Sequence, residues 1–215
     1  MKNELRWKVA QAAEIRWWQN YLRKKPKTDY LKWKLSYWND LIQATGGAPN
    51  AGSKVLDAGC GPAGMFMALD NCQVDAIDPL LDTYEEKLDH FNKKDYPYVN
   101  FFHTPLEIFL PNTTYEYIYC LNAINHVADL NLCFDRLVDL LKPGGKLIVS
   151  IDAHNYSIFK KIFNLIPGDV LHPHQYDLKE YKGMITSRNC VVEDDILYKE
   201  EFLFNYYVLV TRKNV

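Results

Sequence analysis

Residues 55–64 read VLDAGCGPAG, a short apolar run followed at once by three glycines within six positions. An apolar run of this length predicts a buried strand, and the glycines after it predict a tight turn into a helix. Glycine lets the backbone approach a ligand closely, and the N–H groups that begin a helix are free to bind polar ligand groups. The stretch therefore predicts a strand–turn–helix unit for a nucleotide-like ligand.

From this stretch to residue 152 the chain alternates between predicted strands and helices. This alternation predicts crossover connections, and hence a parallel sheet with helices on both faces. The sequence KPGG at 142–145 is predicted to end the last of these helices. The predicted strands are 54–58, 72–79, 98–104, 115–122 and 146–152, and the predicted helices between them are 65–71, 80–94 and 130–141.

The C-terminal part of the chain has a different order of elements. A helix is predicted over 177–189, and two long strands follow directly at 190–200 and 201–213. Two consecutive strands favour an antiparallel pair at one edge of the sheet. The predicted fold class is therefore α/β: a Rossmann-like, doubly wound sheet of seven strands, mostly parallel, with an antiparallel C-terminal edge hairpin.

The N-terminal segment has a helical spacing of apolar residues that is broken at KKPKTD, where Pro26 is a stop signal. A second helix is predicted over 30–45, and GGAPNAGS at 46–53 has the composition of a linker. We therefore expect residues 1–52 to form an N-terminal helical cap, or lid, of the same domain. Residues 53–215 are expected to form the ligand-binding domain.

The composition is that of a folded protein, with 215 residues, 48% of them hydrophobic, and a net charge of only −2. The charge is uneven, because the first forty residues carry ten Lys and Arg against four Asp and Glu. No signal peptide and no apolar run of about 18 residues is present, so we expect a cytoplasmic protein without a membrane span. The cysteines form no C-x-x-C pair, so reduced and mostly buried thiols are expected at Cys60, Cys72, Cys120, Cys133 and Cys190.

Two classes of ligand fit the glycine turn. The spacing from Gly59 to Gly64 satisfies the G-x-G-x-x-G pattern of dinucleotide sites. Asp78 ends the second predicted strand, 21 residues after Asp57, where a carboxylate suits the two ribose hydroxyls of an adenosine ligand. Asp57 favours a ligand that carries positive charge, and Pro62 lacks an N–H that a diphosphate needs. These features favour S-adenosylmethionine over NAD.

Four stretches, VLDAGCGPAG, VDAIDPL, YEYIYCLNAINHV and LLKPGGKLIVSID, resemble the successive motifs of class I S-adenosylmethionine-dependent methyltransferases. The resemblance extends from about residue 53 to the C-terminus. It implies S-adenosylmethionine as the cofactor and methyl transfer as the activity.

The resemblance also implies which residues bind the cofactor. Asp57, Gly59 and Gly61 would line its methionine part, and Asp78 would hold the ribose. Pro105 stands where relatives often carry an acid that meets the adenine amino group, so the backbone near Leu106 is expected to make that contact. The full implied set is Asp57, Gly59, Cys60, Gly61, Asp78, Pro79, Leu80, Leu106, Glu107, Leu121 and Asn122.

The acceptor side is less defined by the sequence. Asn125 and His126 follow the fourth predicted strand, where a methyl acceptor would lie, and His126 is a candidate for acid–base work. His174 is a second catalytic candidate, and the histidines around it have no partners that indicate a metal. Trp18 and Tyr21 are candidates for substrate contact, with packing between helices as the alternative.

The sequence favours a methyltransferase that acts on a small-molecule acceptor, because no additional domain is present to hold a macromolecule. The alternatives are methylation of RNA or protein, docked on the basic N-terminal segment, and a non-catalytic protein that retains the fold. The fourth strand is followed by CLNA and not by an N-P-P-Y-like sequence, which disfavours methylation of base amino groups.

Overall fold

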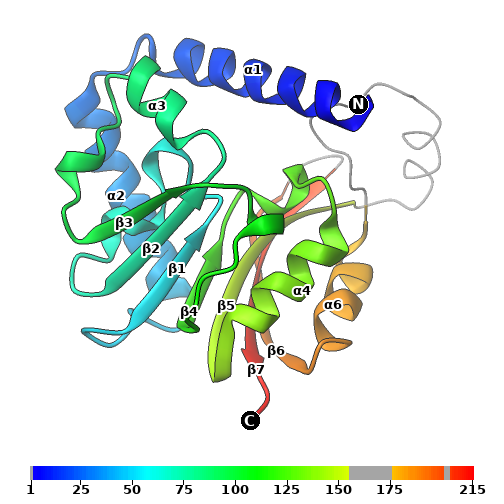
Figure 1. The fold of residues 1–215 in the computed structure, drawn as a ribbon. Helices are drawn as coiled ribbons and strands as arrows, with labels where there is room; N and C mark the ends of the chain where they lie inside the picture. Colours follow the sequence, from blue (N-terminus) through cyan, green and yellow to red (C-terminus); the bar gives the residue numbers. More distant parts are fainter. Residues whose placement is uncertain (1, 155–175, 201–203) are drawn as a thin grey trace.

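A computed structural model describes residues 2–154, 176–200 and 204–215. Its centre is a seven-stranded sheet in the order β3-β2-β1-β4-β5-β7-β6, seen nearly face-on in Figure 1. The first five strands are parallel, and β7 runs antiparallel to both β5 and β6. The predicted fold class is confirmed. The strands are β1 Lys54–Ala58, β2 Gln73–Asp78, β3 Val99–His103, β4 Tyr115–Cys120, β5 Leu141–His154, β6 Cys190–Lys199 and β7 Phe204–Lys213.

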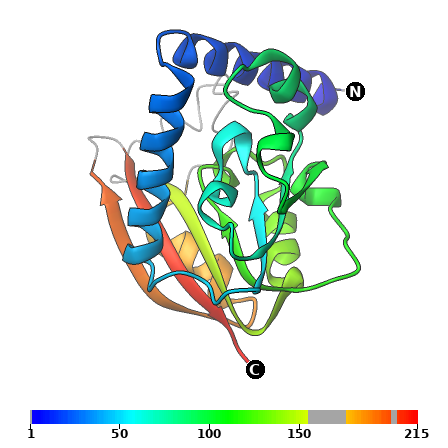
Figure 2. The same ribbon diagram turned by 90° about the vertical axis from the view of Figure 1, so that its left-hand side faces the viewer.

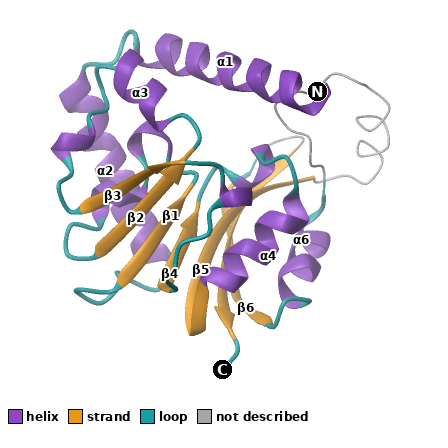
Figure 3. Ribbon diagram, in the orientation of Figure 1, coloured by secondary structure: helices purple, strands orange, loops and turns teal. Residues whose placement is uncertain are grey.

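Helices cover both faces of this sheet, as Figure 3 shows. Along β1, Val55 belongs to the core under α2 and α3, whereas Leu56 belongs to the core under α4 and α6. Successive strand residues point to opposite faces, so a continuous apolar run such as β1 is buried on both. The helices are α1 Lys2–Leu22, α2 Lys27–Ala44, α3 Leu81–Lys87, α4 Leu130–Leu140 and α6 Leu178–Thr186.

The N-terminal segment divides into two helices with different surroundings. Helix α2 packs on one face of the sheet. Its side chains Trp38 and Leu41 are buried in the hydrophobic core on that face. The Trp38 Nε1 atom also donates a hydrogen bond to the carbonyl of Ala63 at 3.0 Å. Helix α1 instead crosses the edge at which the parallel strands end (Figures 1 and 2). This position is the one expected of a lid.

The prediction of a helix over 65–71 is wrong. That segment begins with a 3-10 turn instead, η2 Met65–Ala68, and another 3-10 turn, η1 Gly61–Ala63, precedes it. Gly64 between them has an extended backbone, which interrupts helical hydrogen bonding. The Asp57 Oδ2 atom accepts a hydrogen bond from the N–H of Phe66 at 2.9 Å, which holds the second turn close to β1.

The predicted helix 80–94 is too long. Helix α3 ends at Lys87, and the backbone of Leu88 is extended. Leu88 and Phe91 are buried in the core beneath α3, so the chain turns inward after the helix. The side chain of Asn92 then caps a separate short turn, η3 Lys93–Asp95, by accepting from the N–H of Lys94 at 2.9 Å.

Helix α4 ends at Leu140, just before the KPGG sequence at 142–145 as predicted, but β5 already begins at Leu141 and includes KPGG, five residues earlier than the predicted strand. A Cβ added at Gly145 would lie 3.0 Å from the carbonyl oxygen of Glu116, so glycine allows β5 to approach β4 closely.

Helix α2 begins at Lys27, directly after Pro26, and so three residues earlier than predicted. Pro26 therefore opens a helix, which agrees with its fixed φ. All five cysteines are buried and free, as predicted.

Candidate cofactor site

The glycine turn after β1 is held by backbone hydrogen bonds to β2. The N–H groups of Gly59 and Cys60 both donate to the carbonyl of Ile77, at 2.8 and 3.0 Å. The N–H of Gly61 donates to Asp78 Oδ2 at 3.0 Å. These three N–H groups are therefore already bonded within the chain, contrary to the sequence expectation that such groups stay free for a ligand. A diphosphate group needs such free N–H donors. The arrangement therefore favours an adenosine ligand that has no diphosphate group.

Glycine is required at three positions of this turn for different reasons. Gly59 and Gly61 have φ values of 71° and 58°. A Cβ at Gly59 would lie 2.3 Å from the Cβ of Ala123, whereas at Gly61 the nearest atom is Trp18 Cζ2 at 3.9 Å. A Cβ at Gly64 would lie 2.5 Å from Asp57 Oδ2 and 2.4 Å from a backbone oxygen. Gly64 was left out of the predicted site, although the G-x-G-x-x-G spacing contains it.

Asp78 stands at the end of β2 and faces this turn. Its Oδ2 accepts from Gly61, and its Oδ1 accepts from the N–H of Leu80 at 2.8 Å. Burial, with a further contribution from the Glu14 carboxylate, raises the pKa of Asp78 to about 7. A carboxylate oxygen has more than one acceptor site, so each oxygen retains capacity for a ribose hydroxyl.

Asp57 lies beneath the turn, with 2% of its surface exposed. Burial raises its pKa to about 7, although the N–H of Phe66 and the Lys34 ammonium oppose that rise. The same burial lowers the pKa of Lys34 to about 8, and its Nζ atom lies 4.1 Å from the centroid of the Trp38 ring. Asp57 therefore serves the turn as a hydrogen-bond acceptor and a source of negative potential.

Cys60 is buried between these two acids. Burial and the nearby Asp57 and Asp78 carboxylates raise the pKa of its thiol. A neutral, buried thiol is a poor nucleophile, so the structure assigns Cys60 a packing role in the turn.

Helix α1 is fastened over this site by two contacts with Tyr84 of α3. The ring of Trp18 lies edge-on to the Tyr84 ring, with centroids 6.4 Å apart. The Tyr84 hydroxyl donates to Glu14 Oε1 at 2.7 Å. Glu14 and Tyr84 were missed at the sequence level, because the spacing of Tyr84 is that of an ordinary core residue.

Tyr21 lies elsewhere on α1. Its ring stacks on Trp17, with centroids 4.8 Å apart, and meets the ring of Tyr30 edge-on at 6.1 Å. These contacts place Tyr21 at the junction of α1 and α2. The structure therefore brings Trp18, but not Tyr21, to the glycine turn.

The residues expected around the adenine lie on neighbouring loops. Leu80 is buried and Pro79 is half-buried, directly after Asp78. Leu106 is buried at the start of η4 Leu106–Ile108. The Glu107 Oε1 atom accepts from the N–H of Ala128 at 2.9 Å, so this carboxylate joins η4 to the loop before α4.

The loop after β4 is joined to the end of β5. Asn122 has a φ of 55°, and its N–H donates to Ser150 Oγ at 2.7 Å, while Leu121 before it is buried. The buried Asn125 donates through Nδ2 to Asp152 Oδ2 at 2.8 Å and accepts from the Tyr181 hydroxyl at 3.0 Å.

Asn125 was predicted as a substrate contact, but its amide is bonded to the protein on both sides. Asp152 was not found from the sequence, because its contact with Asn125 joins residues 27 positions apart and leaves no local signal. His126 is exposed at the end of η5 Ile124–His126. His174 lies outside the described residues, and within the described ones no group of three His, Cys, Asp or Glu side chains is arranged to hold a metal.

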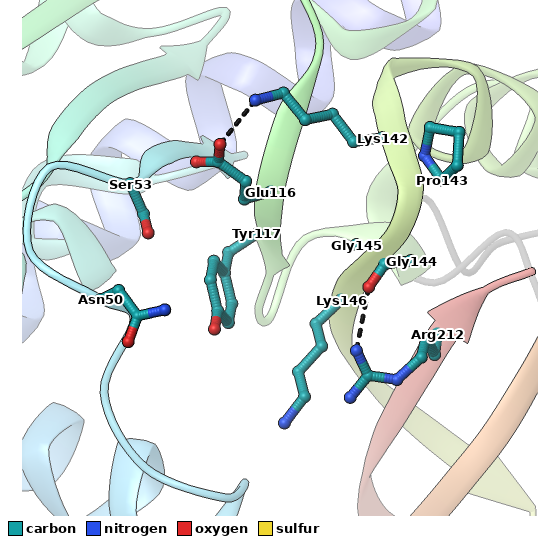
Figure 4. A pocket seen from close by; sticks show the side chains of 10 residues that line it. All are labelled: Asn50, Ser53, Glu116, Tyr117, Lys142, Pro143, Gly144, Gly145, Lys146 and Arg212. Atoms are coloured by element: carbon teal, nitrogen blue, oxygen red, sulfur yellow. Dashed lines mark hydrogen bonds and ion pairs between the residues drawn. The ribbon is translucent and has the colours of Figure 1, made fainter. Parts of the chain in front are cut away.

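A cavity of about 310 Å³ lies at the opposite edge of the sheet (Figure 4). Two of its charged side chains have partners in the cavity wall: Lys142 Nζ lies 2.5 Å from Glu116 Oε1, and Arg212 Nη1 donates to the carbonyl of Gly144 at 2.9 Å. The cavity opens at the amino ends of β1 and β4 and so is separate from the glycine turn. It is lined by Asn50, Ser53, Glu116, Tyr117, Lys142, Pro143, Gly144, Gly145, Lys146 and Arg212.

Comparison with known proteins agrees with this geometry. Residues 30–194 match a family described as "Methyltransferase domain". The chain is 24% identical over 187 residues to a ubiquinone biosynthesis O-methyltransferase of Rickettsia prowazekii, covering 74% of this chain and 71% of that protein. A corresponding enzyme of Marinobacter nauticus is 28% identical over 175 residues, covering 73% and 68%.

Among solved structures, a Burkholderia thailandensis 1,6-didemethyltoxoflavin-N1-methyltransferase with bound S-adenosylhomocysteine is similar. Its TM-score is 0.62 at 14% identity, and the alignment covers 98% of this chain and 88% of that one. The fold and the family match together show that the chain belongs to the class I S-adenosylmethionine-dependent methyltransferases. Its methyl donor is accordingly S-adenosylmethionine.

The residues of the site fit that cofactor. Asp78 keeps acceptor capacity for ribose hydroxyls beside a turn that offers few donors to a diphosphate. Among the residues that the structure describes, Trp18 is the one neighbour within 4 Å of a Cβ built at Gly61, and its contact of 3.9 Å leaves the backbone open to close approach.

Proposed function

We propose that this chain transfers a methyl group from S-adenosylmethionine to a small-molecule acceptor at the carboxyl edge of the sheet. The observation that carries the assignment of residues is the Asp78 carboxylate, bonded to Gly61 and Leu80 at the end of β2. In this proposal Asp78 accepts from the ribose hydroxyls. Asp57, Gly59, Gly61, Leu121 and Asn122 surround the methionine part, and Pro79, Leu80 and Leu106 surround the adenine.

The sulfonium of the cofactor supplies an already activated methyl group, so the chain needs no nucleophile of its own. Its residues instead hold the acceptor in line with the methyl–sulfur bond and exclude water. Trp18 covers the site from α1. On the other side, Asn125 holds Asp152 at the end of β5, where a carboxylate can take the proton that an O–H or N–H acceptor loses.

Two similar proteins support a small acceptor. One is named as a ubiquinone biosynthesis O-methyltransferase and the other as a 1,6-didemethyltoxoflavin-N1-methyltransferase. Both names refer to the methylation of small molecules. A cytoplasmic location stays a prediction from the sequence.

Calorimetric titration tests the cofactor assignment. We expect the wild type to bind S-adenosylmethionine and S-adenosylhomocysteine in the micromolar range, and not NAD. Asp78→Ala should weaken binding at least about tenfold, because two hydrogen bonds to a charged acceptor are lost. The matched control is Asp82→Asn, an exposed acid four residues later that is paired with Lys93, and it should bind normally.

A folded wild type that binds NAD, or that binds neither sulfur compound, would contradict the proposal. Where binding is found, release of S-adenosylhomocysteine in the presence of phenolic and amine compounds then identifies the acceptor. Turnover with any of them excludes a non-catalytic role.

A further inference from the structure

At the α1–α2 corner four aromatic rings contact one another in succession, and the first and last of them reach the surface. Trp17 stacks on Tyr21 at 4.8 Å, Tyr21 meets Tyr30 at 6.1 Å, and Tyr30 meets Trp33 at 5.8 Å between ring centroids. We call these four residues the aromatic ridge; Tyr30 within it is buried and Tyr21 is half-buried, so its exposed surface belongs to Trp17 and Trp33. The two tryptophans at its ends are 54% and 51% exposed. Exposed apolar groups that lie together and are rimmed by polar residues mark interaction sites.

The surroundings of the aromatic ridge are basic. The Lys25 Nζ atom lies 4.1 Å from the centroid of the Tyr21 ring and 5.9 Å from that of Trp33. Residues 15–35 contain seven Lys and Arg and a single acid, Asp29. Lys27 is paired with Asp95, which lies outside this segment. The exposed basic residues that flank the ridge are Arg16, Arg23, Lys24 and Lys32.

Indole rings prefer the headgroup region of a bilayer, because one side of that region is apolar and the other is wet. Lys and Arg beside them are attracted to anionic lipids. We infer that the aromatic ridge and its basic flanks dock the protein on the surface of an anionic lipid bilayer. In the part of the chain that the structure describes, no helix has the length and apolarity to cross a membrane. The contact we propose is therefore peripheral.

The position of the aromatic ridge relates this contact to the active site. Trp17 is on the outer side of α1, while its neighbour Trp18 points inward to Gly61 and Tyr84. Docking would place the bilayer against the helix that covers the cofactor site, at the upper edge of the molecule in Figure 2. The inference does not depend on the proposed acceptor, because its test needs neither cofactor nor acceptor.

The test is co-sedimentation of the full chain with vesicles of phosphatidylcholine alone and of phosphatidylcholine with phosphatidylglycerol at about 3:1. We expect binding to the anionic vesicles only, and its loss at about 0.5 M salt, where charges are screened over a few ångströms. Arg23→Gln with Lys24→Gln should weaken binding about tenfold or more, since each basic residue near such a surface contributes a factor of about five.

Trp17→Gln with Trp33→Gln should weaken binding to a similar extent. Trp17→Gln alone provides a second variant, because Trp17 packs on other rings of its own helix and is mostly exposed. The matched controls are Ile108→Gln with Leu110→Gln, which are 66% and 71% exposed elsewhere, and Lys87→Gln with Lys179→Gln. These controls should bind like the wild type, and circular dichroism verifies that each variant is folded.

Four results would overturn the inference. They are no binding of the folded wild type to anionic vesicles, equal binding to both kinds of vesicle, equal losses in the control pairs, and binding of a single-stranded RNA oligomer without binding of vesicles. The last result would assign the basic surface to nucleic acid.

Discussion

At the scale of single residues, the glycine turn makes a sharp demand on side-chain size. Gly59→Ala would place a Cβ 2.3 Å from Ala123 in a left-handed backbone conformation, and Gly64→Ala would place one 2.5 Å from Asp57 Oδ2. We expect each to lower the free energy of unfolding by more than about 2 kcal/mol. Both substitutions should also weaken the binding of S-adenosylmethionine. Urea denaturation and calorimetry measure the two effects.

Gly183→Ala is the matched control for this pair. Gly183 lies within α6, and a Cβ there would meet nothing within 4 Å. Alanine in a helix interior is favoured over glycine by roughly 0.5–1 kcal/mol, so this variant should be as stable as the wild type or more so. Equal losses at all three glycines would show that the turn has no special role.

The two buried acids predict how cofactor affinity depends on pH. Ribose hydroxyls donate hydrogen bonds, so they bind the ionised form of Asp78, whose pKa is raised to about 7. Affinity for S-adenosylmethionine should therefore fall as the pH decreases below about 7, by at most about tenfold for each pH unit and proton taken up. Titrations at about pH 6, 7 and 8 measure this. A constant dissociation constant over that range would contradict the role of Asp78.

Stability without cofactor should depend on pH in the opposite sense. Burial raises the pKa of Asp57 to about 7, above its value in the unfolded chain. The folded state then binds the proton more tightly, so this group stabilises the fold fully below about pH 4, and the contribution is lost as the pH rises toward 7. Asp57→Asn keeps an oxygen for the N–H of Phe66 but does not ionise. Its free energy of unfolding should decline less than that of the wild type between about pH 4 and 7.

At the scale of elements, α1 offers a comparison between two adjacent tryptophans. Trp18 faces Gly61 and Tyr84, whereas Trp17 is 54% exposed on the outer side. Trp18→Ala should weaken binding of S-adenosylmethionine about tenfold, the equivalent of roughly 1.4 kcal/mol of ring contact. Trp17→Ala should leave that affinity unchanged. Calorimetry with both variants decides whether α1 covers the cofactor, and equal effects would show that it does not.

The sequence predicted strands better than the connections between them, for physical reasons. Strand β1 is short and buried on both faces, and such a strand has a largely apolar sequence that is visible in a single chain. The segment 65–71 beyond the glycine turn was predicted as a helix, because nothing local shows that Asp57 will bond to Phe66 or that Gly64 will be extended. KPGG was correctly interpreted as a stop signal for α4, but its second role, in which Gly145 allows β5 to approach β4 closely, was missed.

The same distinction applies to the candidate site. Asp78 and Asp57 follow from their places at strand ends, which local sequence determines. Trp18 could be separated from Tyr21 only by the crossing of α1 over the sheet. Asp152 is brought to Asn125 by the pairing of β4 with β5, across 27 residues. Tertiary contacts of this kind leave no periodicity in a sequence.

At the scale of the whole molecule, cofactor binding should be visible as stability. A ligand that binds only the folded state adds about 2.7 kcal/mol at one hundred times its dissociation constant. For a chain of this size, each kcal/mol raises the melting temperature by about 2–4 °C. We therefore expect S-adenosylmethionine at that excess to raise the melting temperature by roughly 5–10 °C, and NAD to leave it unchanged. Differential scanning calorimetry or fluorimetry measures the shift.

The two edges of the sheet supply the variants that locate this effect. Asp78→Ala, at the carboxyl edge, should abolish most of the shift, because it removes the acceptor of the ribose hydroxyls. Lys146→Ala, in the cavity at the amino edge, should retain it in full, because that cavity is separate from the glycine turn. If Lys146→Ala lost the shift and Asp78→Ala kept it, the cofactor would bind at the amino edge. The glycine turn would then be a structural connection between β1 and β2, and the assignment of residues around it would be wrong.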